Sequence, residues 1–338
     1  MAFRILCLDG GGIRGIMPAR ILQKVEERLG SPLKNHFDLI AGTSTGSILA
    51  IGIGLGKSPE ELLNLYIEKG LDIFPYQSIF SFKRLPIILK YGPSAPKFSN
   101  EGLMAVLQGE YGEKKFSDIT PDPDKLMDSL KILIPSYDTI RRNPVIFKSW
   151  RHDLWYANVP LWEICLSSAS APTYFPAHRI TPSNGEEYSL IDGGVCANNP
   201  VACAVAEAIK LLRQHSDQFT GDFIDQIKVI SIGTGDPASP IPWKKVRGWG
   251  LVQWGLRIAD VFMDAPPDIH RYVAEQIIGG TDTDREKRYL RLQLPLKDPL
   301  LAMDDARQAN LEGILKETDA YINQVEVQKK LEKLLADW

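Results

Sequence analysis

Two short apolar segments, each ending in a glycine-rich turn and followed by a helical pattern, constrain the fold of this chain most strongly. The first is FRILCL at residues 3–8, which runs into DGGGIRG at residues 9–15. The second is FDLIA at residues 37–41, which runs into GTSTG at residues 42–46. Such runs are typical of strands that are buried on both faces of a sheet. Their alternation with helical patterns predicts a layered α/β fold.

The same alternation continues along the chain. No internal repeat, low-complexity stretch or linker interrupts it, which predicts a single domain over residues 1–338. Further strands are predicted at 130–134, 144–149, 189–191, 228–232 and 289–294. Further helices are predicted at 160–170, 200–214 and 304–328, followed by an amphipathic tail helix.

Composition argues against several classes of function. With 42 acidic and 39 basic residues, the chain has a formal net charge of −3, so it lacks the basic field that attracts nucleic acid. It contains neither a CxxC nor an HExxH pattern. We therefore predict no nucleic-acid partner, no metal site and no cofactor.

The cysteines and the hydropathy predict a cytoplasmic protein. Cys7, Cys165 and Cys203 stand among apolar neighbours and are expected to be buried, reduced thiols. The first apolar run is broken at Asp9 and is too short for the core of a signal peptide. No apolar helical run approaches the ~20 residues of a membrane span. Any contact with a membrane is therefore expected to be peripheral.

The GTSTG turn matches the G-x-S-x-G pattern of a nucleophile elbow, with Ser44 at its centre. In such an elbow a sharp strand-to-helix turn holds the serine hydroxyl clear of the sheet. Gly42 and Gly46 are needed because side chains would collide in so tight a turn. The amide of Thr45 and the helix N-terminus then face negative charge that forms on a substrate. The alternative is a serine that only caps the helix.

Three successive glycines, Gly10, Gly11 and Gly12, follow the first predicted strand. Their N–H groups suit an anion, and an acyl-transfer enzyme needs such donors for its tetrahedral oxyanion. Arg14 adds a positive charge close by. We therefore interpret this loop as a candidate oxyanion site.

The same loop, closed by Gly15, also satisfies G-x-G-x-x-G, the fingerprint of dinucleotide-binding oxidoreductases. That interpretation requires an acidic residue at the end of the second strand, where it would hold the ribose. Asp38 stands at the start of that strand instead. The oxidoreductase remains an alternative at this point.

Asp192 ends a short apolar run and is followed by Gly193 and Gly194. A serine nucleophile needs a base, and none of the five histidines has a sequence context that suits this role. An ordinary aspartate, with a pKa of about 3.9, is a weak base, but burial raises the pKa and makes a Ser–Asp pair chemically reasonable. The alternative is an aspartate that caps the following turn at residues 198–200.

In their order, the motifs at residues 9–15, 42–46 and 192–194 resemble those of the patatin-like phospholipase family. The stretches at 167–176 and 231–235 are similar to the family as well, and the likeness extends from about residue 3 to residue 236. The remaining residues match the family poorly, so the resemblance assigns no role to this C-terminal extension.

The resemblance implies a three-layer α/β/α fold with a mostly parallel central sheet. It also implies a metal-independent Ser–Asp dyad that cleaves acyl esters of membrane lipids, with Ser44 as nucleophile and Asp192 as base. The oxyanion site would be formed by residues 10–12 with Arg14 adjoining. A phospholipase effector gated by a nucleotide is a further alternative within the family.

Residues 71–100 combine aromatic and basic side chains, and no acidic residue stands between Asp72 and Glu101. Such a mixture suits transient contact with anionic lipid. A buried helical cap whose lysines reach solvent is the alternative. The side chains concerned are Phe74, Tyr76, Ile79, Phe80, Phe82, Leu85, Ile87, Ile88, Leu89 and Tyr91, with Lys83, Arg84, Lys90 and Lys97.

Overall fold

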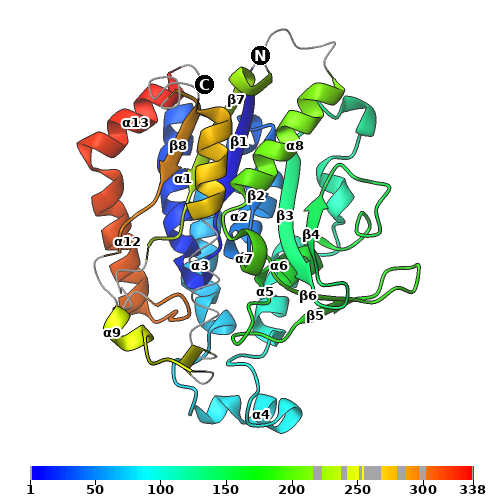
Figure 1. Ribbon diagram of the computed structural model, residues 1–338, viewed down its shortest axis with the longest axis vertical. Helices are drawn as coiled ribbons and strands as arrows, with labels where there is room; N and C mark the ends of the chain where they lie inside the picture. Colours follow the sequence, from blue (N-terminus) through cyan, green and yellow to red (C-terminus); the bar gives the residue numbers. More distant parts are fainter. Residues whose placement is uncertain are drawn as a thin grey trace.

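In the computed structural model, one sheet of eight strands forms the centre of the molecule (Figure 1). The structure describes residues 2–215, 223–236, 242–250, 253–254, 268–279, 287–296, 302–336 and 338. The strand order is β5-β6-β3-β2-β1-β7-β8, and β4 pairs with β3. The strands are β1 Phe3–Leu8, β2 Leu39–Gly42, β3 Lys131–Asp138, β4 Asn143–Lys148, β5 His178–Ile180, β6 Tyr188–Asp192, β7 Ile227–Ile232 and β8 Tyr289–Leu292.

The sheet is mostly parallel. Strands β1, β2, β3, β7 and β8 run in one direction, and β4, β5 and β6 form antiparallel pairs at one side. The register between β1 and β2 sets Leu8 opposite Gly42, so both strands end at the same level. The glycine loop after β1 and the GTSTG turn after β2 therefore leave the sheet side by side.

One edge of β3 brings β6 to the point where β2 ends. Strand β2 pairs with residues 131–133 of β3, and β6 pairs with residues 136–138. Because β4 occupies the other edge of β3, both partners lie along the same edge. Ser136 stands opposite Asp192 in this register. Asp192 therefore lies beside the turn after β2 that carries Ser44.

Helices cover both faces of the sheet. Along β1, Leu6 and Leu8 pack into one core and Ile5 and Cys7 into the other, because successive side chains of a strand point to opposite faces. The first core also contains α1 Ile16–Leu29, α2 Thr45–Gly54, α3 Pro59–Ile73, α5 Glu101–Tyr111, α6 Leu161–Ala169, α12 Gln308–Ile322 and α13 Val325–Leu335. The second contains α8 Val201–Gln214 and a helix over 268–278, which lie in front of the sheet in Figure 1.

Short elements connect these layers. The described α-helices of this kind are α4 Leu85–Tyr91, α7 Gly194–Ala197 and α9 Trp243–Val246. The described 3₁₀ helices are η1 Gly12–Gly15, η2 Leu33–Asn35, η3 Phe82–Arg84, η4 Phe116–Ile119, η5 Pro123–Lys125 and η7 Phe223–Gln226. Together with the sheet and the two helical layers they confirm the three-layer α/β/α fold.

Each strand predicted from the sequence is present, with ends shifted by a few residues, and the short strand β5 was not predicted. The prediction of one helix over 304–328 is wrong. The chain leaves the helical conformation at Gln324, which is extended, and α12 and α13 are separate helices. This break lets Ile314 of α12 and Leu331 of α13 both reach the first core.

The cysteines carry free thiols, and Cys7 and Cys165 are buried as predicted. Cys203 is only partly buried, because it lies on the flank of α8 rather than on the face that packs against the sheet. Among the helices that the structure describes, none has the length and apolar character needed to cross a membrane.

Candidate active site

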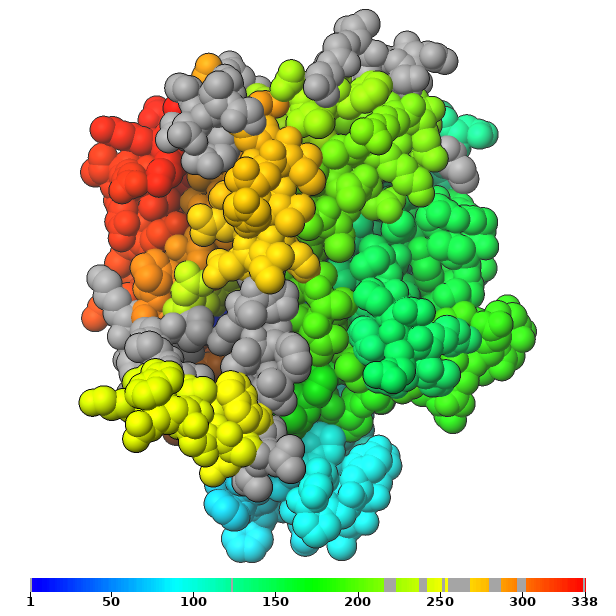
Figure 2. Space-filling view, in the orientation of Figure 1, coloured from blue at the N-terminus to red at the C-terminus, as the bar shows by residue number. Residues whose placement is uncertain are grey.

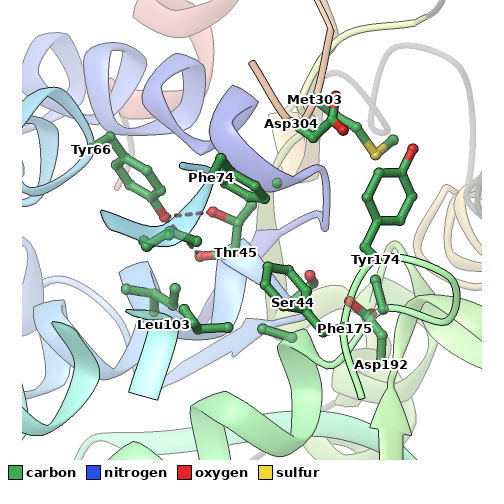
Figure 3. A pocket seen from close by; sticks show the side chains of 15 residues that line it. Ser44, Thr45, Tyr66, Phe74, Leu103, Tyr174, Phe175, Asp192, Met303 and Asp304 are labelled. Atoms are coloured by element: carbon green, nitrogen blue, oxygen red, sulfur yellow. Dashed lines mark hydrogen bonds between the residues drawn. The ribbon is translucent and has the colours of Figure 1, made fainter. Parts of the chain in front are cut away.

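A cavity at the carboxyl ends of β1 and β2 brings Ser44 and Asp192 together (Figure 3). Apart from these two residues its wall is mainly apolar, and α2, α3, α5 and the loop after α6 contribute to it. The lining residues are Gly12, Ser44, Thr45, Ile48, Tyr66, Ile73, Phe74, Leu103, Ala169, Ala171, Tyr174, Phe175, Asp192, Met303 and Asp304.

Ser44 occupies the turn between β2 and α2 in a strained backbone conformation, with φ 54° and ψ −122°. Positive φ is uncommon for a residue with a side chain, and it is characteristic of nucleophile elbows. The Ser44 amide donates to Ser168 Oγ at 2.9 Å, and this hydroxyl donates to the Pro135 carbonyl at 2.6 Å. The Ser44 side chain makes no capping bond to the helix, so the capping alternative is wrong.

The glycines of the elbow are required by close backbone contacts. A Cβ atom on Gly42 would lie 2.1 Å from the Gly46 carbonyl oxygen, and one on Gly46 would lie 2.2 Å from the Leu8 carbonyl oxygen. The elbow also binds the end of β1, because the Thr43 amide donates to Leu8 O at 3.1 Å. The sharp turn therefore forms only with glycine at both positions.

Asp192 is fully buried at the end of β6. Its Oδ1 accepts the Gly194 amide at 2.6 Å, and its Oδ2 accepts no hydrogen bond from the residues that the structure describes. Burial raises the pKa of Asp192 to about 7, and the nearby Ser44 hydroxyl and the Gly194 amide offset part of this rise. Oδ1 thus orders the turn directly after Asp192, at Gly194, and not the turn at residues 198–200 that the capping alternative named.

The glycine loop lies between this cavity and a second, polar one. Gly12 lines the Ser44 cavity, and its amide, like those of Gly11 and Thr45, donates no hydrogen bond to a described residue. The Gly10 amide instead donates to the Asn198 carbonyl oxygen at 3.1 Å, so it is not available to an oxyanion as the sequence predicted. Gly12 has φ +59°, and a Cβ there would lie 2.2 Å from the Met303 carbonyl oxygen.

Other predicted site residues have different surroundings: Arg14, expected to adjoin the oxyanion site, and the turn glycines Gly15 and Gly193. Arg14 lines the polar cavity on the far side of the loop, together with Gly10 and Gly11, and does not line the Ser44 cavity. Gly15 packs against Thr45 and the Tyr66 hydroxyl. Gly193 follows Asp192 where a Cβ would lie 2.3 Å from the Pro135 carbonyl oxygen.

The loop begins at a buried ion pair. Arg291 of β8 contacts both carboxylate oxygens of Asp9, at 2.9 and 2.5 Å, and also donates to Ser231 Oγ at 2.8 Å. Burial raises the pKa of Asp9, and the Arg291 guanidinium opposes this effect. Such a bidentate pair fixes both orientation and position. The first residue of DGGGIRG is therefore held by the C-terminal region.

Several residues of the site have no signal in the sequence. Met303 and Asp304 reach the cavity from the C-terminal region, and the Ile13 amide donates to Met303 O at 2.8 Å. The Tyr66 hydroxyl contacts Thr45 Oγ1 at 2.6 Å and forms part of the inner wall (Figure 3). The contacts between Ile13 and Met303 and between Thr45 and Tyr66 could not be predicted from the sequence, because the two residues of each pair lie in different segments and share no motif.

The alternatives that involve histidine or a dinucleotide find no support. All five histidines lie in the described part of the chain, and none of them lines the Ser44 cavity. Asp38 precedes β2 and accepts the Arg4 amide at 2.7 Å, at the end of the sheet opposite to the glycine loop. It therefore cannot hold a ribose whose pyrophosphate is bound at that loop.

Comparison with known proteins agrees with the order of these motifs. A model of the patatin-like phospholipase family matches residues 6–205. Patatin-like protein 3 of Arabidopsis thaliana is 32% identical over 94% of this chain and 80% of its own length. Probable inactive patatin-3-Kuras 1 of Solanum tuberosum is 30% identical over 98% of this chain and 92% of its own length.

Among solved structures, human GIVD cytosolic phospholipase A2 is similar, with a TM-score of 0.45 and 12% sequence identity. The match covers 99% of this chain and 60% of that protein. The family model spans more than half of the chain, and the Arabidopsis relative is matched over most of its length. The chain therefore belongs to the patatin-like phospholipase family.

Proposed function

We propose that this chain is a serine lipid acyl hydrolase of the phospholipase A type, which cleaves acyl esters of membrane glycerolipids. The observation that carries the proposal is the pairing in one cavity of an elbow serine at positive φ with a buried aspartate whose pKa is about 7. Perturbed titratable groups beside a nucleophile are typical of active sites. Membership of the patatin-like phospholipase family supports a lipid as the substrate.

In this mechanism Asp192 Oδ2 accepts the proton of Ser44 Oγ as the oxygen attacks the ester carbonyl carbon. The π electrons of the carbonyl move to its oxygen. The negative charge then faces the amides of Gly12 and Thr45, with that of Gly11 adjoining, and none of these amides donates to another described residue. Collapse of this intermediate breaks the bond to the alcohol, which receives the proton from Asp192. The acyl group is then bonded to Ser44.

Water completes the cycle by the same route. Asp192 accepts a proton from the water as it attacks the acyl-Ser44 carbonyl, and it returns the proton to Ser44 Oγ when the fatty acid leaves. A base with a pKa near 7 is suited to both steps at neutral pH, because it accepts and releases protons with little cost. No cofactor takes part in the proposed reaction.

The cavity wall supports a fatty acyl chain as the group bound next to Ser44. Ile48, Ile73, Phe74, Leu103 and Phe175 present apolar side chains there. Burial of a hydrocarbon chain against such a wall stabilises the complex by about 0.8 kcal/mol for each CH₂ removed from water. This binding would place the ester carbonyl beside Ser44 and the polar head group toward the mouth.

The test is release of fatty acid from phosphatidylcholine vesicles by purified wild-type protein and two variants. Ser44→Ala should abolish release, and Asp192→Asn should leave less than about a tenth of wild-type turnover, because the amide cannot accept the proton. Asp138→Asn is the matched control, since Asp138 is another fully buried aspartate of the same sheet. If Asp192→Asn is as active as Asp138→Asn, the dyad assignment is wrong.

A further inference from the structure

The segment that links α3 to α5 projects from one end of the molecule (Figure 2). It exposes large apolar side chains. We call residues 79–91, which include η3 and α4, the α4 tip. Within it, Phe80 is 88% exposed, Phe82 95% and Leu89 78%. Ile79, Leu85 and Tyr91 are exposed as well. The alternative of a buried cap therefore fails for the tip.

The tip is basic. No acidic residue stands between Asp72 and Glu101 in the sequence, and Lys83 and Lys90 of the tip are exposed. The groove beside α4 that these two lysines line also contains Asp72 and Glu101, which lie outside the tip. Arg84 donates to backbone carbonyl oxygens on both sides of the tip, including that of Ile79 at 3.3 Å, and so holds its shape. A preformed surface that combines exposed aromatic rings with cations matches an anionic lipid interface.

The base of the same segment forms part of the active-site wall. Phe74 and Phe175 line the Ser44 cavity, and Phe98 contacts both rings at centroid distances of 5.5 and 5.7 Å. Tyr76 packs on Phe98 at 5.1 Å, toward the tip. Aromatic side chains thus extend from the wall of the cavity to Tyr76, which lines the groove beside α4.

Two polar contacts fix the segment to Asp304 in the wall of the cavity. Lys97 forms an ion pair with Asp304, and the Gln77 side-chain amide donates to the Asp304 carbonyl at 2.9 Å. Asp304 itself lines the cavity. Residues on both sides of the tip are therefore anchored to a residue of the cavity wall.

We propose that the α4 tip docks the protein on a bilayer that contains anionic phospholipid. Phe80, Phe82 and Leu89 enter the acyl boundary, and Lys83 and Lys90 lie at the level of the phosphates. The mouth of the Ser44 cavity then faces the lipid, which is the consequence that rests on the proposed function. A second copy of this chain fits the surface less well, because two tips in contact would bring their cations together.

Binding is measured first without catalysis. Ser44→Ala protein is floated with vesicles of phosphatidylcholine, with and without phosphatidylglycerol, and compared with Ser44→Ala carrying Phe80→Ser and Phe82→Ser. We expect the added changes to weaken vesicle binding about tenfold or more, because two aromatic rings lose their apolar environment. Tyr272→Ser, at an exposed aromatic residue of the helix over 268–278, is the matched control and should not change binding.

Charge is tested by Lys83→Gln with Lys90→Gln in the same Ser44→Ala background. Each cation near an anionic surface contributes about 1 kcal/mol, or about fivefold in affinity. Binding to vesicles with phosphatidylglycerol should fall by about that factor for each lysine, while binding to pure phosphatidylcholine should not change. This variant keeps both aromatic residues, so it also tests the surface if the serine variant folds poorly.

Unchanged vesicle binding by both tip variants would overturn the proposal. So would a dimer in sedimentation that the Phe80→Ser, Phe82→Ser change converts to a monomer, since the tip would then bind a second copy. In protein that keeps Ser44, Phe80→Ser with Phe82→Ser should slow the hydrolysis of vesicle lipid. The hydrolysis rate of a dissolved short-chain ester should not change. Tip-dependent binding without any hydrolysis would contradict the proposed function and leave the docking surface intact.

Discussion

At the scale of single residues, the burial of Asp192 has opposite consequences for its proposed function and for the stability of the fold. Its carboxyl group is fully buried, and among the described residues a hydrogen-bond donor reaches only one of its oxygens. Burial favours the protonated form and raises the pKa to about 7. The burial that would suit Asp192 to its proposed role as a base near neutral pH therefore makes its charged form costly to fold.

This cost has a defined dependence on pH. An unfolded aspartate ionises near pH 3.9, whereas Asp192 in the folded chain ionises near pH 7. Between these values the folded state holds a proton that the unfolded state has lost, so the free energy of unfolding falls as pH rises through this window. At pH 8 the full penalty, about 4 kcal/mol, is present.

Asp192→Asn should therefore raise the thermal unfolding temperature at pH 8 and change it much less at pH 4.5. The uncharged amide keeps the shape and the acceptor oxygen for the Gly194 amide while removing the buried charge. Calorimetry of both proteins at the two pH values measures the difference. A variant that is less stable than wild type at pH 8 would show that the carboxylate is well solvated or paired in the folded chain.

At the scale of elements, the two glycine turns could be predicted because each is a local event. A strand, a forced turn and a helix follow one another within about ten residues, and the glycines mark where backbone atoms touch. Asp192 is brought to Ser44 by a different kind of interaction, since β6 reaches the site only through its pairing with β3. Pairing between distant strands leaves no pattern in either segment. The sequence therefore indicates Asp192 as a candidate residue, but it does not predict that β3 brings Asp192 close to Ser44.

The same limit applies to β8, whose Arg291 holds Asp9 at the start of the glycine loop. Removing one partner of a buried pair leaves an uncompensated charge and typically costs about 3–5 kcal/mol. We expect Arg291→Ala to destabilise the chain by about that amount in chemical denaturation. It should also lower the hydrolysis rate.

Arg288→Ala is the matched control for this prediction. Arg288 lies next to β8 and pairs with Asp225, whose side chain is 70% exposed. Ion pairs in contact with water contribute about 1 kcal/mol or less to the free energy of unfolding, so Arg288→Ala should cost less stability than Arg291→Ala. If the two variants lose the same stability, the Asp9–Arg291 pair has no special part in holding the loop.

At the scale of the whole molecule, the candidate active site is assembled from segments that span most of the chain. The loop after β1, the elbow, the end of β6 and residues 303–304 all line one cavity. The family resemblance located the first three and gave no role to the C-terminal residues. That region supplies β8 and helices α12 and α13, which share the first core with α1 and α3.

Hydrolysis should not depend on a divalent cation. Two carboxylates line the Ser44 cavity, and one of them, Asp304, forms an ion pair with Lys97. In the proposed steps Asp192 moves the proton and backbone amides receive the oxyanion. We therefore expect full activity on a dissolved ester in EDTA. Loss of activity in EDTA that calcium restores would indicate a different mechanism of ester cleavage.

The activation of Ser44 by Asp192 is tested most directly by labelling with a fluorophosphonate, followed by mapping of the adduct by mass spectrometry. Wild-type protein should be labelled at Ser44, at a rate that rises with pH around an apparent pKa of about 7 as Asp192 loses its proton. Ser44→Ala should not react, and Asp192→Asn should react at least tenfold more slowly at pH 8. An adduct on another residue, or a labelling rate at Ser44 that is the same in Asp192→Asn, would contradict the account.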